Sequence, residues 1–386
     1  MQAVGEKPSK NFDTEKTLKE GKKKMQLCYY IALAAPPTRR QARESEPFLR
    51  PEVGFNPNWF HCRCGIDFSS RWHQDPCYRW ETIQVMVETV RRCFPGYSIG
   101  GVEGNANPRD LITGVYGVAI IPATFGMTIR YSSNGWPQPF GPTLTDEEAD
   151  RLQAPDLSRN EFFSGVLDQV DQAAHQSGSA EGYLNWQGVL NAAYRLRGEA
   201  IFTDMLETPS RARRIFDAVT SVIIQGARLL YERQRRAGFP VRFLSIGNCM
   251  LNMISPRLYR DLLLPYDLQL RSEFEGFGIH NCAWKLDPHM DAYATVSGLG
   301  YIDMGLSSNL RRARELFPEA RRNLLYTSMD LKNKSWDAIR SDLDRIAREL
   351  APCDLGLPDI EEDVPDGRVR DVLNYCRELN EKAKPE

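Results

Sequence analysis

From residue 241 onward the chain repeats one unit, a short apolar strand followed by a helix, and this repeat constrains the fold more than any other feature. The predicted strands begin roughly 23 to 36 residues apart, which is the spacing of successive strand–helix units. Five such units in a row require a parallel sheet with helices outside it. The predicted strands are residues 241–246, 277–279, 301–304, 324–327 and 354–360.

A closed barrel and an open doubly wound sheet both satisfy this repeat. No Gly-x-Gly-x-x-Gly follows any of the strands, so nothing supports dinucleotide binding. Each strand instead ends in polar residues, which meet at one mouth in a barrel. We therefore predict an α/β fold, a (β/α)8 TIM barrel over residues 97–386, with residues 1–96 as an N-terminal helical and loop extension. The polar residues are Asn248, His280, Asp303, Thr327 with Asp330, and Asp359 with Glu361.

Composition narrows the class of protein. The formal net charge of −2 provides no basic field for nucleic acid. The longest apolar stretches fall well short of the ~20 residues that a membrane-spanning helix needs. Nine cysteines, an odd number in a long chain, favour reduced thiols over a disulfide framework, so we expect a cytoplasmic protein. Cys62 and Cys64 beside His61 could form a second metal cluster, although their spacing matches no common zinc motif, and their role stays open.

The most specific chemical signal is the pair His280 and Cys282 at the end of the second predicted strand. Side chains repeat every two residues along a strand, so the imidazole and the thiol lie on the same side of the chain. Neutral imidazole and thiolate are common ligands of zinc. The alternative is a structural histidine beside a buried cysteine. The position of the pair within the strand–helix repeat favours the metal site.

Residues 59–80 are dense in aromatic side chains and have no clean period, which predicts a loop. This loop either covers a functional site or closes one end of a barrel. In the first case Trp59, Arg71 and Trp72 are candidate substrate-binding residues, and His73 is a candidate catalytic residue.

The middle of the chain contains a predicted β-hairpin. Two short apolar runs, residues 127–131 and 136–140, flank Asn134-Gly135, and Asn-Gly favours a two-residue type I′ turn. The other predicted elements here are a helix that begins with a capping box at Thr145, helices over residues 159–176 and 208–236, and a strand over residues 182–186.

Several short motifs follow one another between residues 97 and 384. They are Gly135-Trp-Pro137 before Thr145-Asp-Glu-Glu148, Leu196-Arg-Gly-Glu199, Glu207-Thr-Pro209, Ile254-Ser-Pro256, Pro265-Tyr266 and His280-x-Cys282. In this order they resemble the uroporphyrinogen decarboxylase superfamily. The resemblance implies a single (β/α)8 barrel with its site at the C-terminal mouth, and a possible homodimer.

That superfamily contains two chemistries. Uroporphyrinogen decarboxylases carry an N-terminal Arg-Gln-Ala-Gly-Arg type motif, and the nearest string here, Arg40-Gln-Ala-Arg43, lacks the glycine. The other branch consists of zinc-dependent methyltransferases, which hold zinc with His-x-Cys and a later cysteine. The resemblance to that branch implies His280 and Cys282 as zinc ligands. The candidates for a third ligand are Cys353 and, in its place, Asp359 or Glu361.

The resemblance implies a corrinoid-dependent methyltransferase. It would move a methyl group, with the help of zinc, between a corrinoid and a thiol or a methoxylated compound, as in O-demethylation. The chain has no Asp-x-His-x-x-Gly cobalamin string, so a small separate corrinoid-binding protein would carry the cobalamin. Asn248 and Asp303 are the other candidate catalytic residues, and Glu103 and Tyr326 complete the candidate substrate-binding residues.

Two alternatives stay open. The first is a metal-free decarboxylase that acts on a tetrapyrrole or another carboxylate, with Arg71, Arg109 and Arg130 as possible carboxylate-binding groups. The second is a barrel that binds a tetrapyrrole or a partner without turnover.

Overall fold

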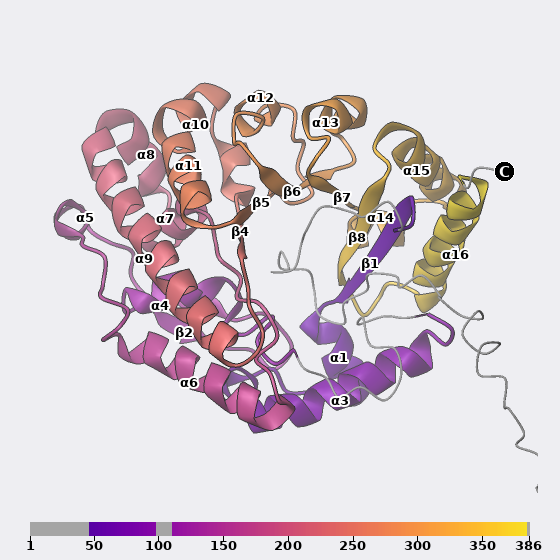
Figure 1. The fold of residues 1–386 in the computed structure, drawn as a ribbon, viewed down its shortest axis with the longest axis horizontal. Coiled ribbons are helices and arrows are strands. Elements are labelled where there is room, and N and C mark those ends of the chain that lie inside the picture. Colours follow the sequence, from indigo (N-terminus) through magenta and orange to yellow (C-terminus); the bar gives the residue numbers. More distant parts are fainter. Residues whose placement is uncertain (1–45, 98–109, 384–386) are drawn as a thin grey trace, which may run out of the picture.

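The computed structural model describes residues 46–97 and 110–383 (Figure 1). Its main sheet has six parallel strands in the order β1-β8-β7-β6-β5-β4. The five strands predicted from residue 241 onward are confirmed in type and order. The strands are β1 (Leu49–Phe55), β4 (Phe243–Gly247), β5 (Gly276–His280), β6 (Leu299–Gly305), β7 (Arg321–Leu325) and β8 (Cys353–Ile360).

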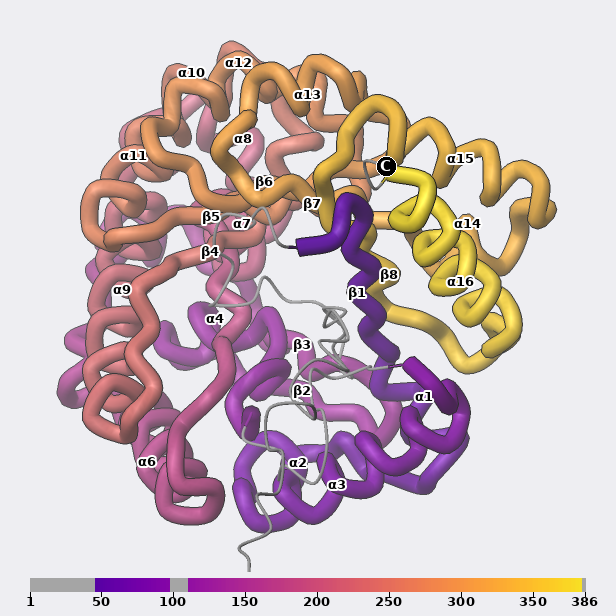
Figure 2. Tube along the Cα trace, turned by 45° about the vertical axis from the view of Figure 1, so that its right-hand side comes forward, coloured from indigo at the N-terminus to yellow at the C-terminus, as the bar shows by residue number. Residues whose placement is uncertain are grey.

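Helices follow the strands and lie on the outer side of the sheet (Figures 1 and 2). Some of them begin at a side-chain cap. The Ser335 side chain, for example, accepts a hydrogen bond from the backbone of Ala338 at the start of α15. The helices are α10 (Pro256–Leu262), α11 (Leu264–Glu273), α12 (Met290–Tyr293), α13 (Leu310–Leu316), α14 (Ser328–Asn333), α15 (Trp336–Glu349) and α16 (Asp366–Lys382).

The hydrogen-bonded sheet of the described ranges does not close into a barrel. Beyond β4 the chain continues the sheet with single bridges, Gln187 to Gly247 and Asp110 to Glu181, both parallel. The predicted strand over residues 182–186 is therefore an irregular segment beside β4. Tyr183 links this segment to β4 in place of regular backbone hydrogen bonds. Its hydroxyl donates to the carbonyl oxygen of Ser245 at 2.6 Å and accepts from the amide of Ser245 at 2.7 Å.

The predicted loop over residues 59–80 is mostly helical, and the loop prediction is wrong. Its helices are α1 (Pro57–Cys64), α2 (Ser70–Gln74) and the start of α3 (Pro76–Cys93). Asn56 and Asp75 cap α1 and α3 through their side chains, and a proline follows each cap, a combination that favours helix initiation. The strand β1 also lies within the segment predicted as an extension, yet it pairs with β8 inside the main sheet.

The hairpin is confirmed as a pairing of β2 (Thr128–Arg130) with β3 (Gln138–Phe140), but its turn is not the predicted one. Residues 131–137 connect the strands, and neither Asn134 nor Gly135 has the positive φ that a type I′ turn requires. The capping box at Thr145 and the two long helices are confirmed. The remaining elements are η1 (Gly117–Ala119), α4 (Ile120–Thr124), α5 (Asp146–Arg151), α6 (Glu161–Ser177), α7 (Val189–Arg197), α8 (Ala200–Glu207), α9 (Pro209–Arg236) and η2 (Cys249–Met253).

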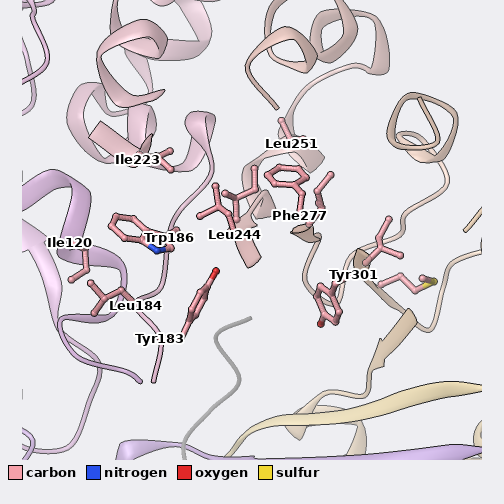
Figure 3. Close-up of a cluster of buried hydrophobic side chains, with 14 of the residues drawn as sticks. Ile120, Tyr183, Leu184, Trp186, Ile223, Leu244, Leu251, Phe277 and Tyr301 are labelled. Atoms are coloured by element: carbon pink, nitrogen blue, oxygen red, sulfur yellow. The ribbon is translucent and has the colours of Figure 1, made fainter. Parts of the chain in front are cut away.

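Apolar side chains fill the space between the sheet and its helices (Figure 3). Trp186 packs close to Gly226 on α9, where an added Cβ would lie 2.8 Å from the indole ring. Leu244 on β4 and Phe277 on β5 extend this core along the sheet. No helix in the described ranges combines the length and the apolar composition needed to cross a membrane.

Candidate metal centre

Three potential metal ligands converge where β4 and β5 end. The Sγ atoms of Cys249 and Cys282 and a ring nitrogen of His280 all lie within 4.8 Å of one another. His280 is the last residue of β5, Cys282 follows two positions later, and Cys249 is the first residue of η2 after β4. All three side chains are half-buried, so the group can be reached from solvent.

The parallel pairing of β4 with β5 brings the third thiol to the other two groups. Gly247 is in register with His280, and the amide of Asn248 donates a 2.8 Å hydrogen bond to the carbonyl oxygen of His280. Cys249 follows directly. The amide of Met250 donates to the side chain of Asn191, which fixes the other side of the loop. The position of Cys249 therefore follows from strand register and two loop hydrogen bonds.

Asp303 on β6 orients His280 and Cys282 through hydrogen bonds. Its carboxylate lies 2.6 Å from Nδ1 of His280 and accepts a 2.9 Å hydrogen bond from the amide of Cys282. It also accepts a 2.7 Å hydrogen bond from the hydroxyl of Tyr301, which in turn accepts one from Asn323. A carboxylate that holds a proton on Nδ1 leaves Nε2 free to bind a metal.

The charges of the three groups depend on one another. A hydrogen bond from the Cys249 thiol lowers the pKa of Cys282 to about 4, and the same contact, with burial, raises the pKa of Cys249 well above its usual range. Burial alone would lower the pKa of His280, but the negative charge of Asp303 and its hydrogen bond to the ring raise it well above its usual value. The cluster therefore contains a thiolate at neutral pH, which is the form of cysteine that binds metals.

Asn248 lies beside this cluster but its side chain turns to a buried carboxylate. Its Nδ2 donates a 2.9 Å hydrogen bond to Asp267, which also accepts one from the hydroxyl of Tyr259 at 2.8 Å. Burial raises the pKa of Asp267 to about 7. Asn248 thus anchors the loop that carries Cys249.

Cys353 is not brought to the cluster. It is the first residue of β8, in register with Leu49, whereas His280 is the last residue of β5. Because the strands are parallel, these two positions lie at opposite ends of the strands, Cys353 at the amino end and His280 at the carboxyl end. Cys353 is fully buried, and burial raises the pKa of its thiol to about 12. The structure therefore does not support Cys353 as the third ligand, and the thiol that lies beside His280 and Cys282 is that of Cys249.

Asp359 and Glu361, the other candidates for the third ligand, do lie at the carboxyl end of β8. Asp359 is not one of the three mutually close groups, but it is near enough for the charges of Cys282 and His280 to act on its pKa. The protein around Asp359 raises the pKa of its carboxyl, and Trp136 donates a 3.2 Å hydrogen bond to it.

The candidate residues of the 59–80 segment are mostly part of the core. Trp59, Trp72 and His73 are almost completely buried, and the amide of Tyr116 donates a 3.0 Å hydrogen bond to Nδ1 of His73. Burial lowers the pKa of His73 to about 3, so it packs as a neutral ring. Arg71 lies on the surface, where it pairs with Asp75 and covers a tyrosine ring. None of these contacts involves Cys249, His280 or Cys282.

Other predicted residues also have local partners. Tyr326 is fully buried and donates a 2.8 Å hydrogen bond to Asp342. Glu103 and Arg109 lie outside the described residues. His61 bonds the carbonyl oxygen of Ile66, and Cys62 and Cys64 each contact a residue of their own helix, so the 61–64 group does not converge on a common centre.

Cys249 is the functional candidate that the sequence analysis missed. The available signal was its place directly after Asn248, at the end of a strand that pairs with the His280 strand.

No family model and no curated protein matches this chain. Among solved structures, the chain is similar to a methyltransferase from Methanosarcina mazei, with 14% identity, a TM-score of 0.60, and coverage of 92% of this chain and 94% of that chain. It is also similar to a putative vitamin-B12 independent methionine synthase from Listeria monocytogenes, with 12% identity, a TM-score of 0.37, and coverage of 65% and 74% of the two chains. The first similarity shows that this chain has the fold of that methyltransferase.

Proposed function

We propose that the protein is a methyltransferase whose zinc ion is held by Cys249, His280 and Cys282. The observation that carries this proposal is the convergence of two thiols and one imidazole with a carboxylate behind the imidazole. Two sulfur ligands and one nitrogen ligand suit zinc, and catalytic zinc sites keep a fourth position open. The carboxylate–histidine pair is the usual outer support of such a site.

The fold supports the same proposal. We infer a (β/α)8 barrel in which the segment near Asp110 and residues 181–187 take the places of the second and third strands, because their single bridges extend the sheet order beyond β4. The cluster then lies at the C-terminal mouth, where barrel enzymes place their chemistry. The likeness to the M. mazei methyltransferase extends over 92% of this chain.

Each residue has a stated task in this proposal. Cys282 and Cys249 supply thiolates, and His280 supplies Nε2. Asp303 keeps the proton on Nδ1 of His280 and fixes the backbone of Cys282. Bound zinc would supply Lewis acidity, which lowers the pKa of a coordinated thiol or polarises an ether oxygen. The methyl group would come from, or go to, a corrinoid on a separate small protein; this part rests on the superfamily resemblance alone.

The proposal is tested by metal analysis of purified protein and of three variants. We expect one zinc per chain in the wild type and in Cys353→Ser, because Cys353 lies at the amino end of its strand, away from the proposed ligands. Cys249→Ser and His280→Ala should lose most of the zinc. The loaded protein should then consume methylcobalamin in the presence of a simple thiol, while His280→Ala does not. Zinc retained by Cys249→Ser but lost by Cys353→Ser would refute the ligand set.

A further inference from the structure

Asp359 is an acidic residue beside the metal cluster that the ligand set does not use. Its Oδ1 accepts a hydrogen bond from Nε1 of Trp136, in the connection between β2 and β3. It is exposed to solvent at the carboxyl end of β8, and the charges of Cys282 and His280 act on its carboxyl. A small molecule bound beside Cys282 and His280 would therefore experience the charge of this carboxylate.

Within the described ranges, Asp359 has no Lys or Arg partner, in contrast to Asp363 and Asp366 farther along the chain. Asp363 pairs with Lys332, and Asp366 pairs with Arg63 at 2.9 Å. The groups that act favourably on Asp359 are the neutral donors Trp136 and Asn56 together with His280. Its negative charge is therefore left for another cation to balance.

The proposed metal centre does not supply that cation. Two thiolates neutralise the two positive charges of zinc, His280 binds as a neutral imidazole, and the carboxylate of Asp303 adds a negative charge, so the loaded centre has no net positive charge. A carboxylate beside such a centre attracts a positive group. The indole of Trp136 adds an aromatic ring, which favours organic cations through its quadrupole.

We propose that Asp359 and Trp136 form a subsite for a compact organic cation, an amine or a quaternary ammonium group, on the small molecule that this centre acts on. The inference rests on the proposed function and specifies its substrate class. The carboxylate supplies the charge, and the indole holds that carboxylate through Nε1 while presenting its ring to the cation. The subsite lies at the carboxyl end of β8, three strands along the sheet from β5.

The test uses two probes of nearly equal shape, choline and its neutral analogue 3,3-dimethyl-1-butanol. Binding of each to the full chain is measured by calorimetry or ligand-observed NMR, with zinc content determined on the same sample. We expect choline to bind at least tenfold more tightly than the neutral analogue. Asp359→Asn should abolish that preference, and Trp136→Leu should weaken it.

Glu361→Gln is the matched control, because it removes one negative charge close to Asp359 without touching Trp136. It should retain most of the preference for choline. Equal binding of the two probes by the wild type, or a preference that survives Asp359→Asn, overturns the subsite. A sample that binds no zinc yet prefers choline in an Asp359-dependent way supports the subsite and refutes the metal centre, so the two failures are distinguishable.

Discussion

Replacement of Asp303 by asparagine is the most direct perturbation of the proposed centre. The change keeps the size of the side chain but replaces one acceptor oxygen by an NH2 donor. In the structure both oxygens are used. One accepts from the amide of Cys282, and the other contacts Nδ1 of His280 and the hydroxyl of Tyr301. Asparagine can satisfy the amide but cannot also accept the Nδ1 proton of His280.

The expected loss follows from the role of that proton. Without a carboxylate on Nδ1, the tautomer of His280 with a free Nε2 is no longer favoured, and the ring is a weaker ligand. Loss of such an outer partner lowers metal affinity by about 10- to 100-fold, or about 1.4 to 2.8 kcal/mol. Tyr301→Phe removes one of the three bonds to Asp303 and leaves the His280 contact, so its effect should be clearly smaller.

The assay is competition for zinc between the protein and a chelating dye at fixed pH. Circular dichroism melts on the same samples show whether each variant is folded. A folded Asp303→Asn protein that binds zinc as tightly as the wild type would refute the reasoning, and so would a Tyr301→Phe variant that loses more affinity than Asp303→Asn.

Three further predictions concern the scaffold. Tyr183→Phe removes the hydroxyl that bonds both backbone groups of Ser245, and denaturant unfolding should show a loss of about 1 to 3 kcal/mol. Gly226→Ala forces a methyl group against Trp186, and its thermal melt should reveal a destabilisation of about 1 to 3 kcal/mol. Because burial raises the pKa of Asp267 to about 7, the folded state binds a proton that the unfolded state releases near pH 4, so this residue makes stability fall as pH rises from about 4 to about 7. Unfolding at several pH values should show a flatter profile for Asp267→Asn.

The sequence predicted β4 to β8 well because each of these strands is a short apolar run followed by a helix signal. It did not predict β1. Pro51, Arg50 and Glu52 make that segment look like a connection, and only the fold shows that Arg50 is balanced by Asp354 on the neighbouring strand. A charge that is neutralised by a residue some 300 positions away leaves no local signal.

The proposed metal ligands show the same limit of prediction from sequence. His280 and Cys282 were predicted because two residues at strand spacing carry their own signal. The third ligand depends on which strand lies next to β5 and on the loop after it. The separation of Cys353 from Cys282 in sequence is plausible for a third ligand, but Cys353 lies at the amino end of its strand. Cys249, in contrast, is brought close to His280 by the pairing of β4 with β5.

All three proposed metal ligands lie at the ends of two adjoining strands, β4 and β5, or directly after them, and Asp303 of the next strand, β6, supports His280 and Cys282. Within the described ranges, β8, β1 and the small hairpin of β2 and β3 contribute none of the three proposed ligands. Substitutions in these elements can therefore change which molecules reach the site while the proposed metal ligands stay the same. Because the proposed ligands and the remaining elements are separate, proteins with the same ligands could differ widely in the substrates that they accept.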